Sequence, residues 1–425
     1  MRADFIIANA AQLLSCAGPV PRRGALQADA RPLSDAAVAS HAGEIVFVGS
    51  ARACDREVEP LPGCQRVDAA GCTVVPGFVD AHTHLVYAGD RRDELRRRLA
   101  GATYASIAAE GGGILRTVRA TRECTEDHLV DIGRMRLREM LECGTTTCEV
   151  KSGYGLTIES ELKLLGAIGR LAAEGPIDVV PTFIGAHEIP PEYRDRREEY
   201  VRLVIEEMIP RVANGRLAEW CDVFCETGVF TVAESRRILR AGMAVGLKPR
   251  IHADELGSSG GAILASELGA RAADHLVFVD RDAARAMAAA GVIATLLPGA
   301  AFYLKLGRFA PARMLIEEGV AVALATDVNP GGGLTPSMPL VITLACFGMD
   351  LTLEEAIVGA TINAACALDR GDRVGSLEPG KQLDAVILNG PVTELLRPGA
   401  NVIRSVIKAG RIVYGDGSPA TTRYE

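Results

Sequence analysis

The sequence predicts an α/β protein: a (β/α)8 TIM-like barrel that carries a small β-sandwich domain built from both chain termini. Three observations predict this fold. Eight apolar segments rich in β-branched residues recur along the middle of the 425-residue chain, amphipathic segments separate them, and further strand-like pieces are confined to the two ends. Apolar strands that alternate with helices are typical of a parallel sheet covered by helices.

One unit recurs along the predicted barrel: an apolar strand, a polar or glycine-rich ending and a helical stretch. The eight strands are expected within residues 72–84, 144–155, 177–188, 219–228, 247–255, 270–278, 291–299 and 319–331. Segments with apolar residues at helical spacing lie between them, for example residues 126–144, 199–212 and 233–246, and Gly144 marks a helix stop. Each strand is therefore expected to be followed by a helix that returns the chain to the start of the next strand.

The two chain ends differ from this pattern. They contain short strand-like pieces divided by turn residues, at 4–10, 44–49, 383–390 and 401–417. Two β-rich ends that enclose a barrel are most simply one small domain. We therefore expect residues 1–70 and 371–425 to form the β-sandwich domain, and residues 71–370 to form the barrel.

The composition limits the possible partners. Lys and Arg total 46 against 54 Asp and Glu, a formal net charge of −8, and no long basic run occurs. Nucleic acid and anionic membranes are therefore not expected partners. The eleven cysteines form no C-x-x-C pair, which is typical of reduced thiols rather than of a disulfide framework. These features favour a cytoplasmic protein.

Histidines gather at the ends of the predicted barrel strands. Five of the seven histidines and one aspartate fall there: His82, His84, His187, His252, His275 and Asp327. Residues i and i+2 of a strand point to the same side, so His82 and His84 should face the same way. Active sites of such barrels lie at the carboxyl ends of the strands, so these side chains are expected to converge. His41 and His128 are expected to be structural or surface residues.

Four of these residues suit one divalent metal. Neutral imidazoles with one carboxylate favour Zn²⁺ or Fe²⁺ over cations that prefer oxygen ligands alone. His82, His84, His252 and Asp327 would provide four protein ligands and leave an open coordination position. The alternative is a set of buried histidines satisfied by backbone carbonyls. The convergence of the whole set at the carboxyl ends of the barrel strands favours a metal site.

Longer motifs connect the chain to a known superfamily. The phrases PGFVDAHTH, HADE, ADH and ATDVNPG together resemble the amidohydrolase superfamily of metal-dependent hydrolases, over nearly the whole chain. Many members hold two metals bridged by a carboxylated lysine on the fourth strand, but residues 219–228 contain no lysine. Lys151 ends the second strand instead and is expected in a local ion pair or backbone contact. One metal is therefore favoured, with Glu226 as the candidate that could hold a second.

Within the superfamily, seven phrases in the right order resemble the imidazolonepropionase family of histidine degradation: HTHLVYAGDR, GATYASIAAEGGGI, KSGYGL, GAHEIPPEY, DVFCETGVF, LLPGAAFYL and ATDVNPG. These hydrolases open the lactam ring of 4-imidazolone-5-propanoate to N-formimidoyl-L-glutamate. The resemblance implies substrate or product contacts from Arg91, Tyr154, His187, Glu255, Asn329, Gly331 and Gly332. Gly332 stands where the family usually has Ser or Thr, so a hydroxyl contact would be lost.

A cation for the substrate carboxylate is expected soon after the first strand. Arg91 can make a bidentate contact to a carboxylate. The arginines that follow are expected to form a solvated, ion-paired face of a helix: Arg92, Arg96, Arg97 and Arg98. The glycine-rich residues 110–114 lack the Lys-Ser/Thr of a phosphate loop and are expected to form a mobile loop near the mouth.

The resemblance also implies catalytic roles for Asp327, Glu255 and His275. Asp327 would hold the attacking water and pass its proton to the departing ring nitrogen, and Glu255 would hydrogen-bond a ring nitrogen and assist proton transfer. His275 would orient the water or bind the oxyanion, with a direct metal bond as the alternative. A homodimer is implied by the resemblance alone.

Two other functions remain open at this stage. A purine or pyrimidine aminohydrolase (a deaminase) of the same superfamily would use the same metal ligands, and release of ammonia would identify it. A non-catalytic relative that keeps the fold as an assembly module would be expected to lose metal ligands, which this chain retains.

Overall fold

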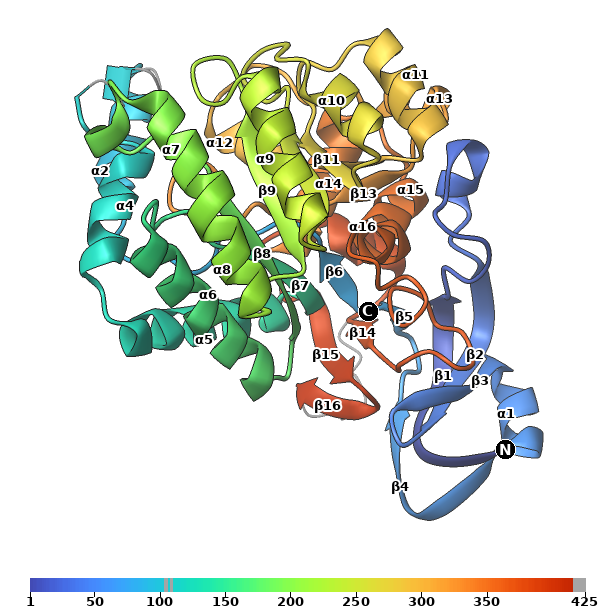
Figure 1. Cartoon of the computed structure of the whole chain (residues 1–425). Helices are drawn as coiled ribbons and strands as arrows, with labels where there is room; N and C mark the ends of the chain where they lie inside the picture. Colours follow the sequence, from blue (N-terminus) through green and yellow to red (C-terminus); the bar gives the residue numbers. More distant parts are fainter. Residues whose placement is uncertain (103–105, 108–109, 416–425) are drawn as a thin grey trace.

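The computed structural model describes residues 1–102, 106–107 and 110–415, and these residues form two eight-stranded sheets (Figure 1). One sheet is wholly parallel, and its strands are neighbours in chain order, which confirms the predicted (β/α)8 barrel. Its strands are β6 (Phe78–Asp80), β7 (Thr145–Lys151), β8 (Asp178–Ala186), β9 (Trp220–Cys225), β10 (Lys248–Ala253), β11 (Ala272–His275), β12 (Ile293–Leu296) and β13 (Val322–Leu324).

The barrel closes just beyond the carboxyl ends of its first and last strands. Thr83 and Val328 form a parallel bridge there. The His84 N–H donates to the Val328 carbonyl at 2.9 Å, and the Asp327 N–H donates to the His82 carbonyl at 3.0 Å. The closure therefore brings the two predicted groups of metal ligands together.

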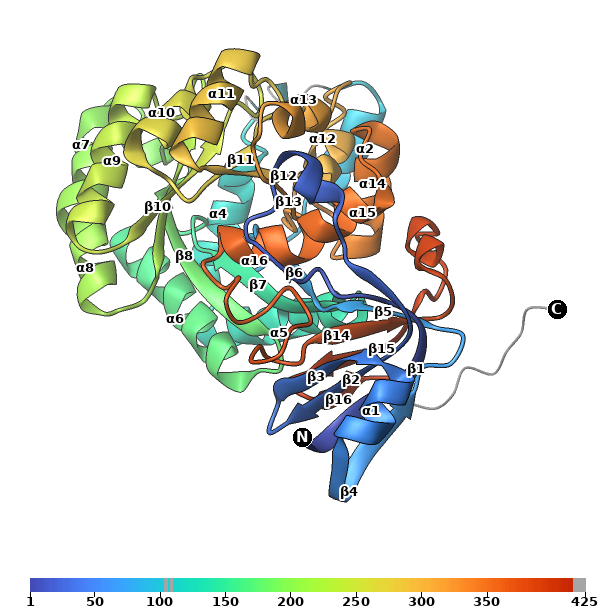
Figure 2. The same cartoon turned by 90° about the vertical axis from the view of Figure 1, so that its right-hand side faces the viewer.

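Helices surround the barrel sheet and alternate with its strands (Figures 1 and 2). Helix α1 (Ala51–Glu57) packs instead against the sheet formed by the chain ends. The barrel helices of the first half of the chain are α2 (Arg92–Leu99), α4 (Ile114–Glu123), α5 (Glu126–Glu142), α6 (Ile158–Glu174), α7 (Arg197–Leu203), α8 (Ile209–Asn214) and α9 (Val232–Ala244). The later helices are α10 (Gly261–Leu268), α11 (Arg281–Ala290), α12 (Pro298–Tyr303), α13 (Ala312–Glu317), α14 (Met338–Gly348), α15 (Leu353–Val358) and α16 (Ala364–Ala367).

Helix α5 shows why the predicted segments are helical. The Thr125 hydroxyl caps its first turn by accepting a bond from the His128 N–H. The helix ends before Gly144, whose φ of +91° favours glycine. A Cβ at Gly144 would lie 2.8 Å from a ring carbon of Phe78 in β6. The buried residues of α5 recur at helical spacing: Leu129, Val130, Gly133, Leu137, Met140 and Leu141.

The second sheet is mixed and takes strands from both ends of the chain, as predicted (Figure 2). Its order is β16-β15-β14-β5-β1-β2-β3, with β4 paired to β1. Successive residues of β1 face opposite sides, so that Ile7 and Ile6 belong to different apolar clusters. Its strands are β1 (Arg2–Leu14), β2 (Pro32–His41), β3 (Glu44–Ser50), β4 (Glu59–Asp68), β5 (Thr73–Pro76), β14 (Ala385–Leu388), β15 (Ile403–Lys408) and β16 (Arg411–Tyr414).

The prediction of one continuous strand over residues 72–84 is wrong. β5 pairs with β1 and β14 in the terminal sheet, whereas β6 pairs with β7 in the barrel. Gly77 lies between them, and a Cβ there would be 2.3 Å from the Thr146 hydroxyl oxygen, so only glycine fits where the chain passes from one sheet to the other.

In the described part of the chain, no helix is both long and apolar enough to cross a bilayer.

Candidate active site

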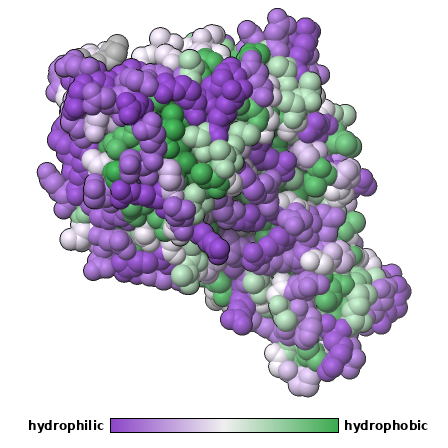
Figure 3. Space-filling view, in the orientation of Figure 1, coloured by the Kyte–Doolittle hydropathy of each residue, from purple (hydrophilic) through white to green (hydrophobic). Residues whose placement is uncertain are grey.

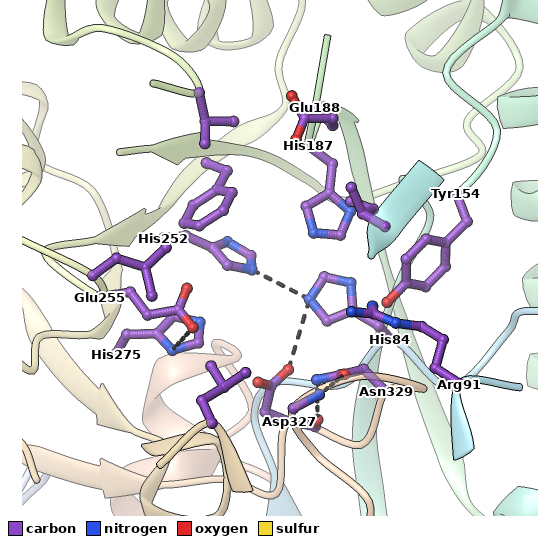
Figure 4. Close-up of a pocket in the computed structure, with 16 residues that line it drawn as sticks. His84, Arg91, Tyr154, His187, Glu188, His252, Glu255, His275, Asp327 and Asn329 are labelled. Atoms are coloured by element: carbon purple, nitrogen blue, oxygen red, sulfur yellow. Dashed lines mark hydrogen bonds and ion pairs between the residues drawn. The ribbon is translucent and has the colours of Figure 1, made fainter. Parts of the chain in front are cut away.

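A cavity opens at the carboxyl ends of the barrel strands (Figure 4). His82 is fully buried next to it. Gly331 does not line the cavity but packs against Arg91, which does. The other residues predicted to bind one metal, to bind substrate or to act in catalysis all line it: His84, Arg91, Tyr154, His187, His252, Glu255, His275, Asp327, Asn329 and Gly332.

The Nε2 atoms of three histidines converge at one end of this cavity. His82 and His84 follow β6, and His252 lies in β10. The Nε2 of His84 lies 3.3 Å from that of His82 and 3.2 Å from that of His252. Asp327 Oδ1 lies 3.6 Å from His82 Nε2 and 3.8 Å from His84 Nε2. Because a tetrahedron with metal–ligand bonds of about 2.0–2.1 Å has edges of about 3.3–3.4 Å, these four groups fit one metal ion.

Buried carboxylates fix the position of the proton on two of these rings. His82 Nδ1 lies 2.8 Å from Asp274 Oδ2, and His252 Nδ1 lies 3.1 Å from Asp222 Oδ1. Each Nδ1 therefore donates its hydrogen, and each Nε2 presents a lone pair to the other ligands. Burial lowers the pKa of His82 and His84 well below the usual histidine value, which favours the neutral form. Converging lone pairs repel one another unless a cation lies between them, which supports a metal here.

Five fully buried charged groups lie behind the histidines: Glu149, Lys151, Asp222, Arg250 and Asp274. Lys151 Nζ is 2.6 Å from Glu149 Oε1 and 2.7 Å from Asp222 Oδ2. The Arg250 guanidinium is 3.2 Å from Asp274 Oδ2. Burial alone would raise the pKa of Asp222, but His252 and Lys151 hold it well below its usual value. Lys151 thus makes the expected local ion pair with Glu149, and it also bridges from β7 to β9.

Glu226, the candidate for a second metal, is bonded to backbone groups. Its Oε2 accepts from the Glu255 N–H at 3.1 Å and from the Leu256 N–H at 2.9 Å, and its Oε1 accepts from the Thr227 N–H at 2.8 Å. Glu226 does not line the cavity. Its carboxylate therefore shapes the loop that carries Glu255.

Glu255 and His275 lie on one side of the predicted metal ligands (Figure 4). His275 Nδ1 is 3.6 Å from Glu255 Oε1. Burial raises the pKa of Glu255 well above its usual value and lowers that of His275. His275 and Asp327 have φ angles of 75° and 54°. Left-handed backbone is costly for residues other than glycine and clusters at functional sites.

Arg91 and Tyr154 lie on the other side of the predicted metal ligands (Figure 4). Arg91 immediately precedes α2, and its Nε donates to Glu94 Oε2 at 2.7 Å. The prediction that Arg98 lies on a solvated face of α2 is wrong. Arg98 is buried and donates to the carbonyls of Gly331 at 2.6 Å and Tyr303 at 3.0 Å. One face of α2 packs against the loop before α4 and the turn after β13, so Glu94 and Arg98, one turn apart, are both buried.

A buried carboxylate holds the turn that carries Tyr154. Glu161 accepts from the N–H groups of Gly153 at 3.0 Å and Gly155 at 2.8 Å. His187 Nδ1 donates in turn to the Gly153 carbonyl at 3.0 Å, so its Nε2 is the hydrogen-bond acceptor of the ring. Burial lowers the pKa of His187 to about 3, which keeps this nitrogen an acceptor.

The turn after β13 is held by Asn329. Its Oδ1 accepts from the N–H groups of Gly331 and Gly332, both at 2.7 Å, and its Nδ2 donates to the Asp327 carbonyl at 2.7 Å. The N–H of Gly332, the one polar group expected to contact product there, is therefore bonded within the turn. A Cβ at Gly331 would lie 2.4 Å from an Arg91 terminal nitrogen, so the chain approaches the guanidinium closely.

Several supporting residues were not found from the sequence. Asp222 and Asp274 carry a signal, since each is a lone aspartate inside an apolar strand. Glu94 looks like an ordinary charged residue of an exposed helix, and only the fold shows its burial.

His41 pairs with Asp4 at 3.5 Å on the exposed surface of the terminal sheet, away from the cavity as expected. The cavity is also lined by Ile114, Glu188, Phe224, Val229, Leu256 and Leu304.

Comparison with known proteins finds relatives over nearly the whole chain. Residues 73–413 match the Amidohydrolase family. The chain is 50% identical over 417 residues to an imidazolonepropionase of Symbiobacterium thermophilum, covering 97% of this chain and 98% of that protein. It is 49% identical over 418 residues to an imidazolonepropionase of Geobacillus kaustophilus, again covering 97% and 98%.

Solved structures of two other proteins have folds similar to that of this chain. An adenosine deaminase from Xanthomonas campestris with bound zinc has a TM-score of 0.72 at 19% identity, covering 99% of this chain and 95% of that chain. A triazine hydrolase from Arthrobacter aurescens has a TM-score of 0.74 at 18% identity, covering 99% and 96%. At these identities the likeness concerns the fold alone. By its family match and its full-length relatives, the chain belongs to the amidohydrolase family and, within it, to the imidazolonepropionases.

Proposed function

We propose that this protein hydrolyses the lactam ring of 4-imidazolone-5-propanoate to N-formimidoyl-L-glutamate in histidine degradation. The observation that carries the proposal is one cavity that places a guanidinium and a carboxylic acid on opposite sides of a four-ligand metal site (Figure 4). The substrate has matching parts: a carboxylate at one end and a cyclic amide at the other. The full-length relatives, which are imidazolonepropionases, support the same reaction.

The proposed cofactor is one divalent metal, Zn²⁺ or Fe²⁺, held by His82, His84, His252 and Asp327. The spacing of their ligand atoms and the carboxylates behind two of the rings support this set. When bound, such an ion lowers the pKa of a water molecule to about 7 and polarises a carbonyl. The expected homodimer stays a prediction.

The substrate is oriented by residues on the Arg91 side. Arg91 binds the propanoate carboxylate, since a guanidinium matches the geometry of a carboxylate. Tyr154 contacts the bound molecule from the neighbouring turn, and His187 accepts a hydrogen bond at Nε2 from an N–H of the substrate ring. Asn329 holds the turn of Gly331 and Gly332 against the product.

Proton transfer is assigned to the two carboxyl groups. Asp327 Oδ1 faces the histidines, which leaves Oδ2 to take a proton from the attacking water. Burial raises the pKa of Asp327 well above its usual value, whereas a cation bound beside it would lower that pKa and keep the carboxylate ionised as the base. Glu255, whose pKa is also raised by burial, hydrogen-bonds a ring nitrogen and assists transfer of the proton to the departing nitrogen. His275 orients the water or binds the developing oxyanion.

The alternative functions are not favoured. A deaminase would share the metal ligands, but the deaminase relative among the solved structures is 19% identical, whereas the imidazolonepropionases are 44–50% identical over 88–98% of this chain. An assembly module without activity would not be expected to keep four converging ligands.

The test is an ultraviolet assay with 4-imidazolone-5-propanoate on protein whose metal content has been measured. We expect the imidazolone absorbance to fall and N-formimidoyl-L-glutamate to appear, with His252→Ala losing both metal and turnover. A matched control is His128→Ala on the exposed face of α5, which should behave as wild type. Metal-loaded protein that leaves the imidazolone unchanged would overturn the proposal, and ammonia release from a purine or pyrimidine would favour the deaminase.

A further inference from the structure

The carboxylate of Glu94 contacts both the Arg91 side chain and the loop that precedes α4. Oε2 accepts from Arg91 Nε at 2.7 Å, and Oε1 accepts from the Gly113 N–H at 2.9 Å. The side chains of Arg91 and Glu94 are 5% and 3% exposed. Glu94 does not line the cavity, so it acts on a bound molecule through Arg91 and the loop.

The turn after β13 packs on the guanidinium of Arg91 from another direction. A Cβ at Gly331 would lie 2.4 Å from one terminal nitrogen and 2.6 Å from Cζ of Arg91. Arg98, one helical turn after Glu94, donates to the Gly331 carbonyl at 2.6 Å and so holds this turn in place. Two contacts therefore fix the orientation of the Arg91 guanidinium. Glu94 binds its Nε atom, and the Gly331 backbone packs against its terminal nitrogens.

The loop before α4 is packed equally closely on Glu94. A Cβ at Gly112 would lie 2.9 Å from Glu94 Oε1 and 2.8 Å from the Ile107 side chain. Ile114, the first residue of α4, lines the cavity. A change in the position of the Glu94 carboxylate would therefore move both the cation and one apolar residue that face a bound molecule.

We propose that Glu94 is a positioning residue for the anionic end of the substrate: it holds the Arg91 guanidinium at the angle that meets a carboxylate and couples that cation to the loop carrying Ile114. Arginine binds carboxylates strongly when its planar fork is presented in the right orientation, and a fork fixed before binding loses less entropy. The assignment rests on the proposed function, which supplies the substrate carboxylate.

The test compares 4-imidazolone-5-propanoate with its methyl ester, which keeps the ring and removes the charge. In Glu94→Gln, the single amide oxygen can still accept from the Gly113 N–H, but the NH2 group then faces Arg91 Nε and cannot accept its hydrogen, so that bond is lost. We expect KM for the acid to rise by about tenfold while kcat changes by less than about threefold. The kcat/KM for the ester should stay at the wild-type value, so the preference for acid over ester should fall by about tenfold.

Asp93→Asn is the matched control, because the preceding residue of α2 pairs with Arg116 at 2.6 Å on the exposed surface. It should leave the KM for the acid and the acid-to-ester preference unchanged. Equal losses for acid and ester in Glu94→Gln, or an unchanged preference, would overturn the assignment while leaving the proposed function intact. A wild-type protein that does not turn over the acid would overturn both. Thermal unfolding of each variant, together with its metal content, separates a loss of positioning from a loss of folding.

Discussion

The floor and the wall of the cavity are held in different ways. The floor, formed by His82, His84, His252 and Asp327, is supported by buried carboxylates from inside strands β9 and β11. The wall around Arg91 is formed by the start of α2, the loop before α4 and the turn after β13. Side chains of α2 bond to backbone groups of the other two segments, which approach closely at glycines. Contacts within the barrel fix the floor, whereas the wall requires three separate segments outside the barrel strands to meet. Metal binding and substrate binding should therefore be separable by mutation.

The largest effect is expected from the buried lysine behind the floor. Lys151→Met would leave Glu149, Asp222 and Asp274 with Arg250 as the remaining cation of the cluster. Removing one partner of a buried ion pair costs about 3–5 kcal/mol, and urea unfolding should show a loss of unfolding free energy of that size. The double variant Lys151→Met/Glu149→Gln removes one negative charge as well and should recover part of the loss. A change below about 1 kcal/mol in Lys151→Met would show that the cluster does not need its lysine.

A smaller effect, measured at the metal, is expected from Asp274→Asn, which also removes a charged partner of Arg250. The variant weakens the acceptor that orients the His82 ring through Nδ1. Changes to such supporting residues typically lower metal affinity by about 10–100-fold, which competition with a chromophoric chelator would measure. Asp282→Asn on α11, whose side chain is 90% exposed, is the control and should bind metal as the wild type does. Wild-type affinity in Asp274→Asn would mean that the backbone alone orients His82.

The variant Gly331→Ala should disturb the wall and leave the floor unchanged. The added methyl group would lie 2.4 Å from an Arg91 terminal nitrogen and must displace the guanidinium. We expect KM for the acid substrate to rise by about tenfold, with metal content unchanged. Gly169→Ala in α6, where a Cβ would meet nothing within 4 Å, is the control and should stabilise the helix by about 0.5–1 kcal/mol without affecting KM. Loss of metal in Gly331→Ala would show that floor and wall are coupled.

The convergence of the floor residues could be predicted from the sequence because imidazoles and a carboxylate have distinctive chemistry and lie at strand ends. His82, His84 and His252 needed only the strand pattern and the rule that barrel sites form at carboxyl ends. The support of the floor could not be predicted, since Lys151 pairs with Asp222, 71 residues away in the chain. The wall was harder still, because the burial of Glu94 and Arg98 depends on the rotation of α2 against two loops. The change of sheet at Gly77 was hidden for a similar reason: an apolar run shows burial, but not which sheet buries it.

The smallest effect is expected at the surface, where the same kinds of charge meet without burial. Arg134 Nε lies 2.9 Å from Glu174 Oε2, with side chains that are 53% and 39% exposed. Water and salt screen such a pair, and the two long side chains lose entropy when they associate. Glu174→Gln should therefore leave the thermal unfolding midpoint and the kinetics of the wild type unchanged, in both low and high salt. A loss comparable to that of Lys151→Met would mean that pairing itself, rather than the absence of water around Lys151, makes the charges behind the floor important.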